Sequence, residues 1–420
     1  MSDPAAGTAA PPVRRTSYRE LLANRRFILY TLSSTAAATG YSVYAISIPW
    51  LALDVSKSLF LVGLVLFAEF GVYTLTFLVA PWVDRAGNKR TIFLLCYPVQ
   101  AVAAAGIGIG LADHALGPGL LLALVVVISF LWDFAWAANN IVPRLLLPSD
   151  QLFRAEGLRG LLSGLTQLGG NAVGAALVVL VSPSGGMFLY AALLAVGTGF
   201  AALVSLPQAS AVARAPARFW SEFREGWQYF GRRTRGSLFS LGLVELVQGL
   251  FAAAPTLLIT AIAFRVLSGS SAAYTTLFVA WVVGGVIVGL ALGELNPRGR
   301  IGAILLVSLV AQGALVLAAL AVAPHLLFGA ILWLLIGGAA SAYVSAKYVF
   351  LQGAFPPEAL GRITSNLYLF TGISSAVGAL ALGEVATSWS PVAFGALVGV
   401  GFLLAGAMVL ATPAIRRLTF

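Results

Sequence analysis

Three acidic residues lie inside long apolar stretches of the sequence, where a charge is costly. Glu69 is in VLFAEFGVY, Asp133 is in FLWDFAWAANN, and Glu245 is in LGLVELVQGL. A charge at the centre of a bilayer costs about 2.5–3.5 kcal/mol on insertion scales, so such residues are rarely kept for structure alone. A carboxyl group in this setting is able to hold a proton or a cation. We therefore predict that Glu69, Asp133 and Glu245 face a central polar cavity and bind protons or substrate.

The neighbours of Asp133 at helical spacing favour a binding role. Asp133, Trp136 and Asn140 share one helix face, and Trp132 lies beside that face. An acid flanked by indole rings suits an amphipathic or cationic substrate, through charge and cation–π contact. The alternative is a pair of Trp side chains that face lipid and an aspartate that is hydrogen-bonded to a neighbouring helix.

Two further polar residues lie near Glu245 or in a comparable place. Gln248 follows Glu245 by one helical turn, so the two residues together are predicted to couple protons or bind substrate. Lys347 lies near the end of a later apolar run. It either pairs with an acid of the first half of the chain or extends along the helix to the membrane surface, which is the interpretation we favour.

The elements that carry these residues are long apolar helices. The chain of 420 residues is 60% hydrophobic and 10% charged, with a mean hydropathy of +0.94. Apolar runs of about 20 residues recur, which is the length that spans a bilayer as a helix, and no period-two alternation indicates a barrel. We predict an all-α membrane protein with twelve transmembrane helices. The predicted spans are 27–53, 61–83, 91–111, 119–142, 161–181, 187–206, 237–264, 272–293, 301–323, 326–349, 366–386 and 391–412.

The net charge of +10 is distributed by side of the membrane. All 25 Lys and Arg residues except Lys57 and Arg265 fall in the tails or connectors of one face, counting Lys347 at the inner end of its span. Cytoplasmic connectors carry an excess of Lys and Arg. This distribution predicts a multi-pass protein of the plasma membrane with both termini in the cytoplasm, and it argues against nucleic acid as a partner.

The two halves of the chain resemble one another. LPSDQLFR at residues 147–154 and FPPEALGR at residues 355–362 both fit Pro-x-acid-x-Leu-x-Arg, and ELNPRGR at 294–300 is a weaker echo of 84–90. Matching connectors indicate a duplicated six-helix unit, as in many transporters. The predicted divisions are a mobile cytoplasmic tail at 1–24, a six-helix bundle at 25–206, a cytoplasmic amphipathic linker at 207–236, a second bundle at 237–412 and a tail at 413–420.

The connector APWVDRAGNKR carries the strongest family signal. Its Asp-Arg-x-Gly-x-Lys-Arg string, between spans two and three, resembles the signature loop of the major facilitator superfamily. The Pro-acid-Leu-Arg connectors and the stretch IPWLALDVSKS resemble the bacterial and archaeal efflux branch, which includes macrolide, siderophore and lysophospholipid exporters. The sequence departs from the usual pattern at Ala80, where the family has Gly, and at Asn88, where a cation is frequent.

The resemblance implies that this loop is a latch that holds the cytoplasmic side shut in one state. Asp84 is expected to meet the positive end of a helix from the other half. Arg85, Lys89 and Arg90 are expected to pair with carboxylates or lipid headgroups, and Gly87 to permit a tight turn. The alternative is that the cations only set the topology.

The same resemblance implies a secondary transporter working by alternating access, most simply the proton-coupled efflux of a small amphipathic or drug-like molecule, as a multidrug antiporter would perform. The alternatives are an exporter or flippase of a lysophospholipid or siderophore, and an importer. The expected partners are the substrate, protons and membrane lipids, and we expect a monomer.

Motifs of membrane enzymes and pumps are missing from the sequence. His-Glu-x-x-His, Gly-x-Ser-x-Gly and a Walker loop do not occur. His114 and His325 are far apart, and Cys96 is the only cysteine. We therefore expect no metal site, no cofactor and no enzymatic activity.

Overall fold

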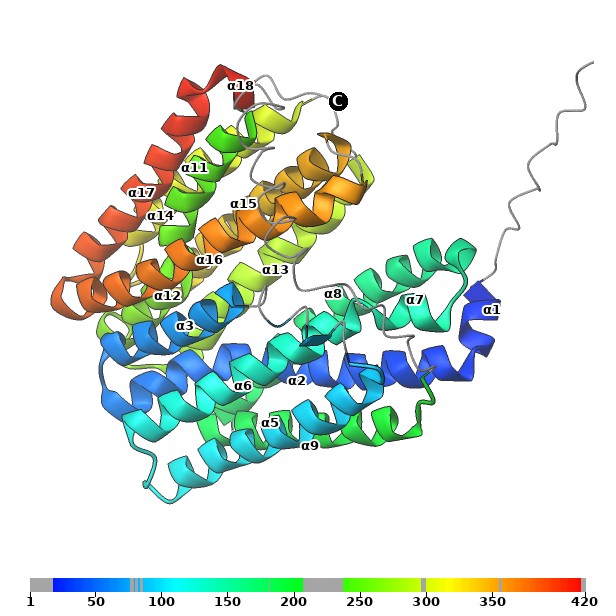
Figure 1. Ribbon diagram of the computed structural model, residues 1–420. Helices are drawn as coiled ribbons and strands as arrows, with labels where there is room; N and C mark the ends of the chain where they lie inside the picture. The colour runs from blue at the N-terminus through cyan, green and yellow to red at the C-terminus, as the bar shows by residue number, and fades with distance from the viewer. Residues whose placement is uncertain are drawn as a thin grey trace, which may run out of the picture.

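The computed structural model describes residues 18–75, 79, 82–83, 86–180, 182–206, 237–295, 300–354 and 357–416, and it is helical throughout this part of the chain (Figure 1). The helices are α1 (Tyr18–Ala23), α2 (Arg25–Ser56), α3 (Leu59–Thr74), α5 (Lys89–Ala112), α6 (Pro118–Asn139), α7 (Val142–Leu146), α8 (Ser149–Leu180), α9 (Pro183–Leu203), α11 (Ser237–Leu250), α12 (Ala254–Arg265), α13 (Ser271–Leu295), α14 (Ile301–Ala321), α15 (Leu326–Ala354), α16 (Pro357–Ser388), α17 (Pro391–Ala411) and α18 (Pro413–Arg416).

The prediction of an all-α membrane protein is confirmed. Within the described residues, ten helical segments are long and apolar enough to cross a membrane. The two other predicted spans coincide with α3, which is a shorter apolar helix, and with α8, which has 32 residues. A bilayer-spanning helix needs about 20 apolar residues because the backbone groups have no water to bond.

One predicted span is broken in two, contrary to our expectation of a single helix at 237–264. The segment divides into α11 and α12, with a turn at 251–253 between them. Pro255 lies in the first turn of α12, where the ring fixes the backbone and supplies no N–H to a preceding carbonyl. The amide of Ala254 instead bonds to the carbonyl of Phe251 at 3.0 Å, which closes a tighter turn and ends the first helix.

The predicted tails are shorter than expected. Residues 18–23, assigned to a mobile tail, form α1, and its Leu21 is fully buried. Residues 413–416 form α18, in which Ile415 is fully buried. An apolar side chain that is removed from water stabilises the packed position of each short helix. The predicted linker at 207–236 lies outside the described residues.

The internal repeat appears in the structure as two matching helices. α8 begins at Ser149 and α16 begins at Pro357, 208 residues later, and each has 32 residues. The Pro-acid-Leu-Arg strings therefore lie mostly in the first turns of helices rather than in connectors. An acidic residue is favoured in a first turn because the N-terminal end of a helix carries partial positive charge.

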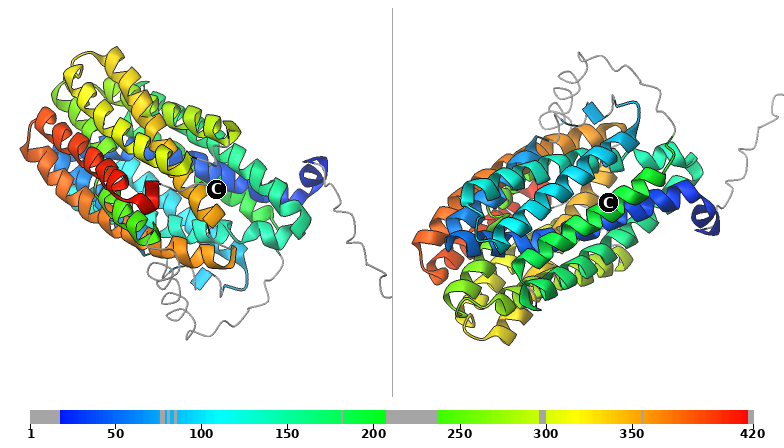
Figure 2. Two further views of the ribbon diagram at one scale, coloured as in Figure 1. Left: turned by 90° about the horizontal axis from the view of Figure 1, so that it is seen from above. Right: turned by 90° about the horizontal axis from the view of Figure 1, so that it is seen from below.

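The spans are arranged as two bundles. In the first bundle, α2 packs on α8 and α9, and α5 packs on α6 and α9; in the second, α13 packs on α15, and α14 on α15 and α17. The bundles meet mainly along α3 with α16 and α8 with α13. Figure 2 shows the blue-to-green helices of the first bundle nearest the viewer from below, and the yellow-to-red helices of the second nearest from above.

One contact makes α13 and α15 a tightly joined pair. A Cβ atom on Gly284 of α13 would lie 1.7 Å from the carbonyl oxygen of Leu334, and one on Gly337 of α15 would lie 1.8 Å from the carbonyl oxygen of Trp281. Only glycine allows two membrane helices to approach so closely. The two backbones therefore touch along the middle of the pair.

The bundles are in close contact at the end of the molecule where α2 passes into α3, which we call the hairpin end (residues 56–59, 266–270 and 388–390). The Tyr274 hydroxyl of α13 donates to the Ile46 carbonyl of α2 at 2.9 Å, and its ring packs on Trp50 at 5.1 Å between centroids. A Cβ atom on Gly63 of α3 would lie 2.6 Å from the Cα of Gly383 on α16. The hairpin end is therefore closed by side-chain and backbone contacts between the bundles.

The opposite end, which carries α1 and α18 and which we call the terminal end, is packed differently. None of the side chains described from Gly160 to Gly169 on α8 is buried, and Leu161 and Leu165 are 58% and 57% exposed. A Cβ atom on Gly160 or Gly164 would meet nothing within 4 Å. Figure 1 shows the two bundles diverging toward the side on which α1 lies.

Candidate functional site

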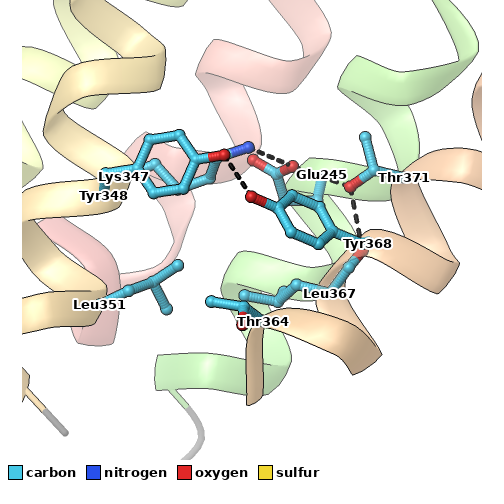
Figure 3. Close-up of a pocket in the computed structure, with 8 residues that line it drawn as sticks. All are labelled: Glu245, Lys347, Tyr348, Leu351, Thr364, Leu367, Tyr368 and Thr371. Carbon is cyan, nitrogen blue, oxygen red and sulfur yellow. Dashed lines mark hydrogen bonds and ion pairs between the residues drawn. The ribbon is translucent and has the colours of Figure 1, made fainter. Parts of the chain in front are cut away.

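A buried ion pair lies inside the second bundle (Figure 3). Glu245 of α11 is fully buried. Its Oε2 accepts hydrogen bonds from Lys347 Nζ of α15 and Thr371 Oγ1 of α16, each at 2.9 Å. Its Oε1 accepts one from the Tyr343 hydroxyl at 2.5 Å. Breaking such a pair leaves an uncompensated charge, so the carboxylate and the ammonium group hold each other in place.

A small pocket opens beside the ion pair. The Tyr348 and Tyr368 hydroxyls bond to one another at its edge, and the ammonium group of Lys347 lies 5.7 Å from the centroid of the Tyr348 ring. Figure 3 shows Lys347 and Tyr348 extending from α15 toward Glu245 and Tyr368. The other lining residues are Leu351, Thr364, Leu367 and Thr371. The pocket therefore joins a cation, a carboxylate and phenol groups to an apolar wall.

This geometry corrects the interpretation of Lys347. We expected its ammonium group to reach the membrane surface, with an acid of the first half as the alternative partner. The side chain is instead 11% exposed and pairs with Glu245 of its own bundle. An ammonium group buried in an apolar bundle must be paired, and α15 places Lys347 against α11 rather than outward.

Several residues of this site were not singled out from the sequence. Tyr343 lies one helical turn before Lys347, so both side chains reach Glu245 from one face of α15. That spacing was a signal in the sequence, whereas Thr371 of α16 carried none. Gln248 is half-buried and makes none of the hydrogen bonds that Glu245 accepts.

Glu69 lies in the first bundle, apart from this pair. Its Oε1 atom is buried, and no group in the described part of the chain forms a hydrogen bond with it. The fully buried Tyr44 hydroxyl of α2 lies beside the carboxyl group and is likewise unpartnered there. Glu69 is thus a second buried acid, with surroundings very different from those of Glu245.

Asp133 is also buried in the first bundle, at 4% exposure. The predicted face around it is divided, because Trp136 is 47% exposed and Asn140 is exposed as well. Trp132 makes the aromatic contact, stacking on Tyr41 with 4.0 Å between centroids and 9° between planes. The indole that accompanies the acid in the interior is therefore Trp132.

A phenol group relates the two bundles. Tyr73 of α3 lies within electrostatic range of both Asp133 and Tyr348. Its ring meets that of Tyr368 edge to face, at 6.0 Å between centroids. Since Tyr368 lines the pocket beside Glu245, aromatic side chains connect the acid of the first bundle with the ion pair of the second.

The signature loop is only partly described, since Asp84 and Arg85 lie outside the described residues. We expected Lys89 and Arg90 to pair with carboxylates or headgroups. Lys89 is 2% exposed and donates to the carbonyl oxygen of Ala86 at 2.6 Å, and the Arg90 guanidinium donates to that of Ala202. Carbonyl groups at helix ends attract cations because they carry partial negative charge.

Two other loop positions have local roles. Gly87 lies in a bend, but its φ is not positive, so the expectation that the turn needs glycine is wrong. Asn88 is the N-cap of α5, and its side chain accepts from the amide of Arg90 at 3.0 Å. Asn is among the best N-cap residues, which gives a structural reason for Asn at this position.

The two helical bundles, with acids buried in each, define a membrane transporter with the major facilitator fold. No model of a protein family matches the chain. It is similar to "Enterobactin exporter EntS" of Salmonella typhi, at 29% identity over 332 residues, which are 78% of this chain and 77% of that protein. EntS of Citrobacter koseri is 28% identical over 331 residues, with the same shares covered.

Solved structures share the fold at lower identity. The nucleoside transporter NupG superposes with a TM-score of 0.72 at 13% identity, covering 92% of this chain and 98% of that chain. A D-xylose-proton symporter has a TM-score of 0.72 at 14% identity, covering 96% and 100%. A bacterial homolog of the human lysosomal transporter Spinster, inward-facing and occupied, has a TM-score of 0.66 at 17% identity, covering 96% and 98%.

Proposed function

We propose that the protein is a secondary active exporter of the plasma membrane, in which the two bundles give alternating access and protons are exchanged for substrate. The substrate is a small amphipathic or drug-like molecule. The clustering of Lys and Arg on one face supports cytoplasmic termini. With that orientation the terminal end faces the cytoplasm and the closed hairpin end faces outward.

The ion pair of Glu245 and Lys347 is the observation that carries this proposal. When Glu245 takes up a proton, the pair loses its attraction and the charge of Lys347 becomes available to a polar or acidic group in the pocket. When the proton leaves, Glu245 reclaims Lys347 and the substrate loses its partner. One carboxyl group thereby exchanges a proton for substrate within a two-state bundle.

A siderophore is the second candidate substrate, and the names of the relatives favour it. EntS proteins are described as exporters of enterobactin. The pocket supports this class with one cation and two phenol groups, which suit an acidic aromatic ligand. Lysophospholipid export and import remain the outcomes that would redirect the assignment.

We further propose that the loop at 84–90 acts as a latch at the terminal end. The contacts of Lys89 and Arg90 support this role because they fix the loop to the first bundle, through Ala86 and Ala202. A loop held on one bundle presents its remaining charged groups to the other bundle as a unit.

The test is transport into inverted membrane vesicles that carry the protein, with the vesicle interior made acidic. The probes are tetraphenylphosphonium and radiolabelled enterobactin. Removing a charge-assisted hydrogen bond costs about 1.5–3 kcal/mol, so Glu245→Gln is expected to lower gradient-driven uptake by about tenfold or more. Asp133→Asn tests the first bundle, and Asp113→Asn, which changes an exposed acid, is the control.

A second measurement separates proton coupling from substrate binding. Glu245→Gln resembles the protonated state, so exchange of labelled for unlabelled substrate without a gradient should persist. Gradient-driven uptake that is equal in wild type, Glu245→Gln and Asp133→Asn would refute the site. Uptake of neither probe by the wild type would direct the assignment to labelled lysophospholipid.

A further inference from the structure

Glu69 lies directly beneath the contacts that close the hairpin end. It follows Gly63 by six residues on α3, which is about 9 Å along a helix axis, and Gly63 abuts Gly383 of the second bundle. Tyr274, which bonds to Ile46 across the bundles, lies within electrostatic range of Glu69. The closing contacts and the acid therefore belong to one region of the molecule.

The surroundings of Glu69 contain phenol groups rather than cations. The ionisable side chains shown within electrostatic range of it are Tyr41, Tyr44, Tyr190 and Tyr274. The charged residues nearest in the helices packed against α3 are Asp133 of α6, Asp54 and Lys57 of α2, Arg265 of α12 and Glu384 of α16.

The cations among these residues are engaged away from Glu69. Lys57 pairs with Asp54 at the surface of the hairpin end, where both side chains are exposed. Arg265 donates to the carbonyl oxygens of Trp389 and Thr387, at 2.8 and 2.7 Å. Neither cation therefore compensates a negative charge at Glu69 while the hairpin end is closed.

An ionised carboxylate is costly in such a place. Burying an unpaired charge is far more unfavourable than burying a neutral carboxyl group, and groups in this situation neutralise instead. Glu245 avoids the cost through Lys347 and two hydroxyl donors, whereas the buried Oε1 of Glu69 has no such donor.

We propose that Glu69 couples closure of the hairpin end to the binding of one proton. The carboxylate takes its proton from the aqueous phase on that side when the end is open, and it retains the proton while Tyr274–Ile46 and Gly63–Gly383 are in contact. Because the closed form binds the proton more tightly, the proton in turn favours the closed form. Deprotonation opens the end toward the outside.

This inference rests on alternating access but not on the ion pair of Glu245. It adds a second proton site, in the other bundle, whose effect is on conformation and needs no substrate. The stabilising protonated form is populated at low pH, so the ratio of open to closed molecules must rise with pH, by at most about tenfold per pH unit for one proton.

The experiment measures the hairpin end directly with a pair of spin labels. Asp113→Cys of the first bundle and Trp389→Cys of the second are exposed at this end, and Cys96→Ala removes the single native cysteine. Distances are recorded by pulsed electron resonance in nanodiscs, from pH 5 to pH 9. The wild type should show a growing long-distance population as pH rises.

The variants decide the assignment. Glu69→Gln should stay closed at every pH, Glu69→Asp should keep the pH response, and Glu384→Gln, an exposed acid at the same end, should behave as wild type. Tyr274→Phe, which loses the bond to Ile46, should raise the open population at every pH.

The contradicting results are distinct. Opening that is independent of pH, or a pH response that survives in Glu69→Gln, would overturn the coupling and leave the exporter proposal standing. A hairpin end that stays closed at every pH, with and without Tyr274→Phe, would overturn both. Loss of transport in Glu245→Gln with an unchanged pH response would show that the two sites act separately.

Discussion

At the scale of single residues, the protein holds its buried acids in two different ways. Glu245 is surrounded by an ammonium group and two hydroxyl donors. Glu69 has phenol neighbours, and its buried oxygen has no hydrogen bond within the described residues. The first arrangement stabilises a charge, and the second disfavours one. The two carboxyl groups should therefore respond differently to substitution.

Lys347→Met tests the charge at the ion pair. The variant leaves Glu245 ionised and uncompensated, so it should lower stability by about 3–5 kcal/mol. The double variant with Glu245→Gln should recover most of that loss. Thermal unfolding is followed with a thiol-reactive dye, since Cys96 is buried on α5 and becomes accessible on unfolding.

The matched control is Lys57→Met, which removes the exposed pair with Asp54. Exposed pairs contribute little, so the unfolding midpoint should hardly change. Equal instability of Lys347→Met and the double variant would mean that Lys347 stabilises the bundle by packing rather than by charge.

At the residue scale, sequence reasoning identified the acids and missed their partners. Glu69, Asp133 and Glu245 stand out because a carboxyl group in an apolar run is rare and costly. Lys347 was misjudged because its partner depends on which helices are neighbours. That α11, α15 and α16 meet is a property of the folded bundle, and no spacing along the chain reveals it.

At the scale of helices, close approach of backbones decides how the bundles meet. Gly63 and Gly383 allow α3 to touch α16, and the lack of a side chain at both positions brings two polar backbones together. Sequence predicted the helices themselves well, because an apolar run of about 20 residues has one solution in lipid. It missed the break between α11 and α12, although Pro255 was a visible signal.

Gly63→Ala should part the helices at the hairpin end. The added Cβ would lie 2.6 Å from the Cα of Gly383 and 2.7 Å from the carbonyl oxygen of Ala379, and backbone atoms are unable to yield as a flexible side chain does. The spin-label distance at the hairpin end should lengthen even at acid pH, and the unfolding midpoint should fall.

Gly71→Ala is the control on the same helix. A Cβ at that position meets nothing within 4 Å, and alanine favours a helix over glycine by about 0.8–1 kcal/mol. This variant should keep the wild-type distance and be slightly more stable. If both variants behaved alike, the contact with Gly383 would have no part in closure.

At the scale of the whole molecule, the bundles touch at one end and diverge at the other. The sequence predicted the two-bundle plan through its repeated connectors, which reappear as helices starting 208 residues apart. It could not predict which end is closed, because the two states of an alternating-access protein share one sequence and differ by a small free energy.

The orientation in the membrane is testable with two single cysteines in a Cys96→Ala background. Asp113→Cys lies at the hairpin end, and Leu22→Cys is exposed on α1 at the terminal end. A membrane-impermeant maleimide should label Asp113→Cys in intact cells and Leu22→Cys only after the membrane is permeabilised, as the distribution of Lys and Arg requires. The reverse pattern would invert the proposed direction of transport.

The joined pair of α13 and α15 has a mechanical consequence. α13 carries Tyr274 near one end of the molecule, and α15 carries Lys347 near the other. Because the backbones touch at Gly284 and Gly337, the pair has no soft layer of side chains in which a displacement could be absorbed. It therefore acts as a stiff lever, and a tilt imposed at the ion pair arrives at the opposite end with little loss.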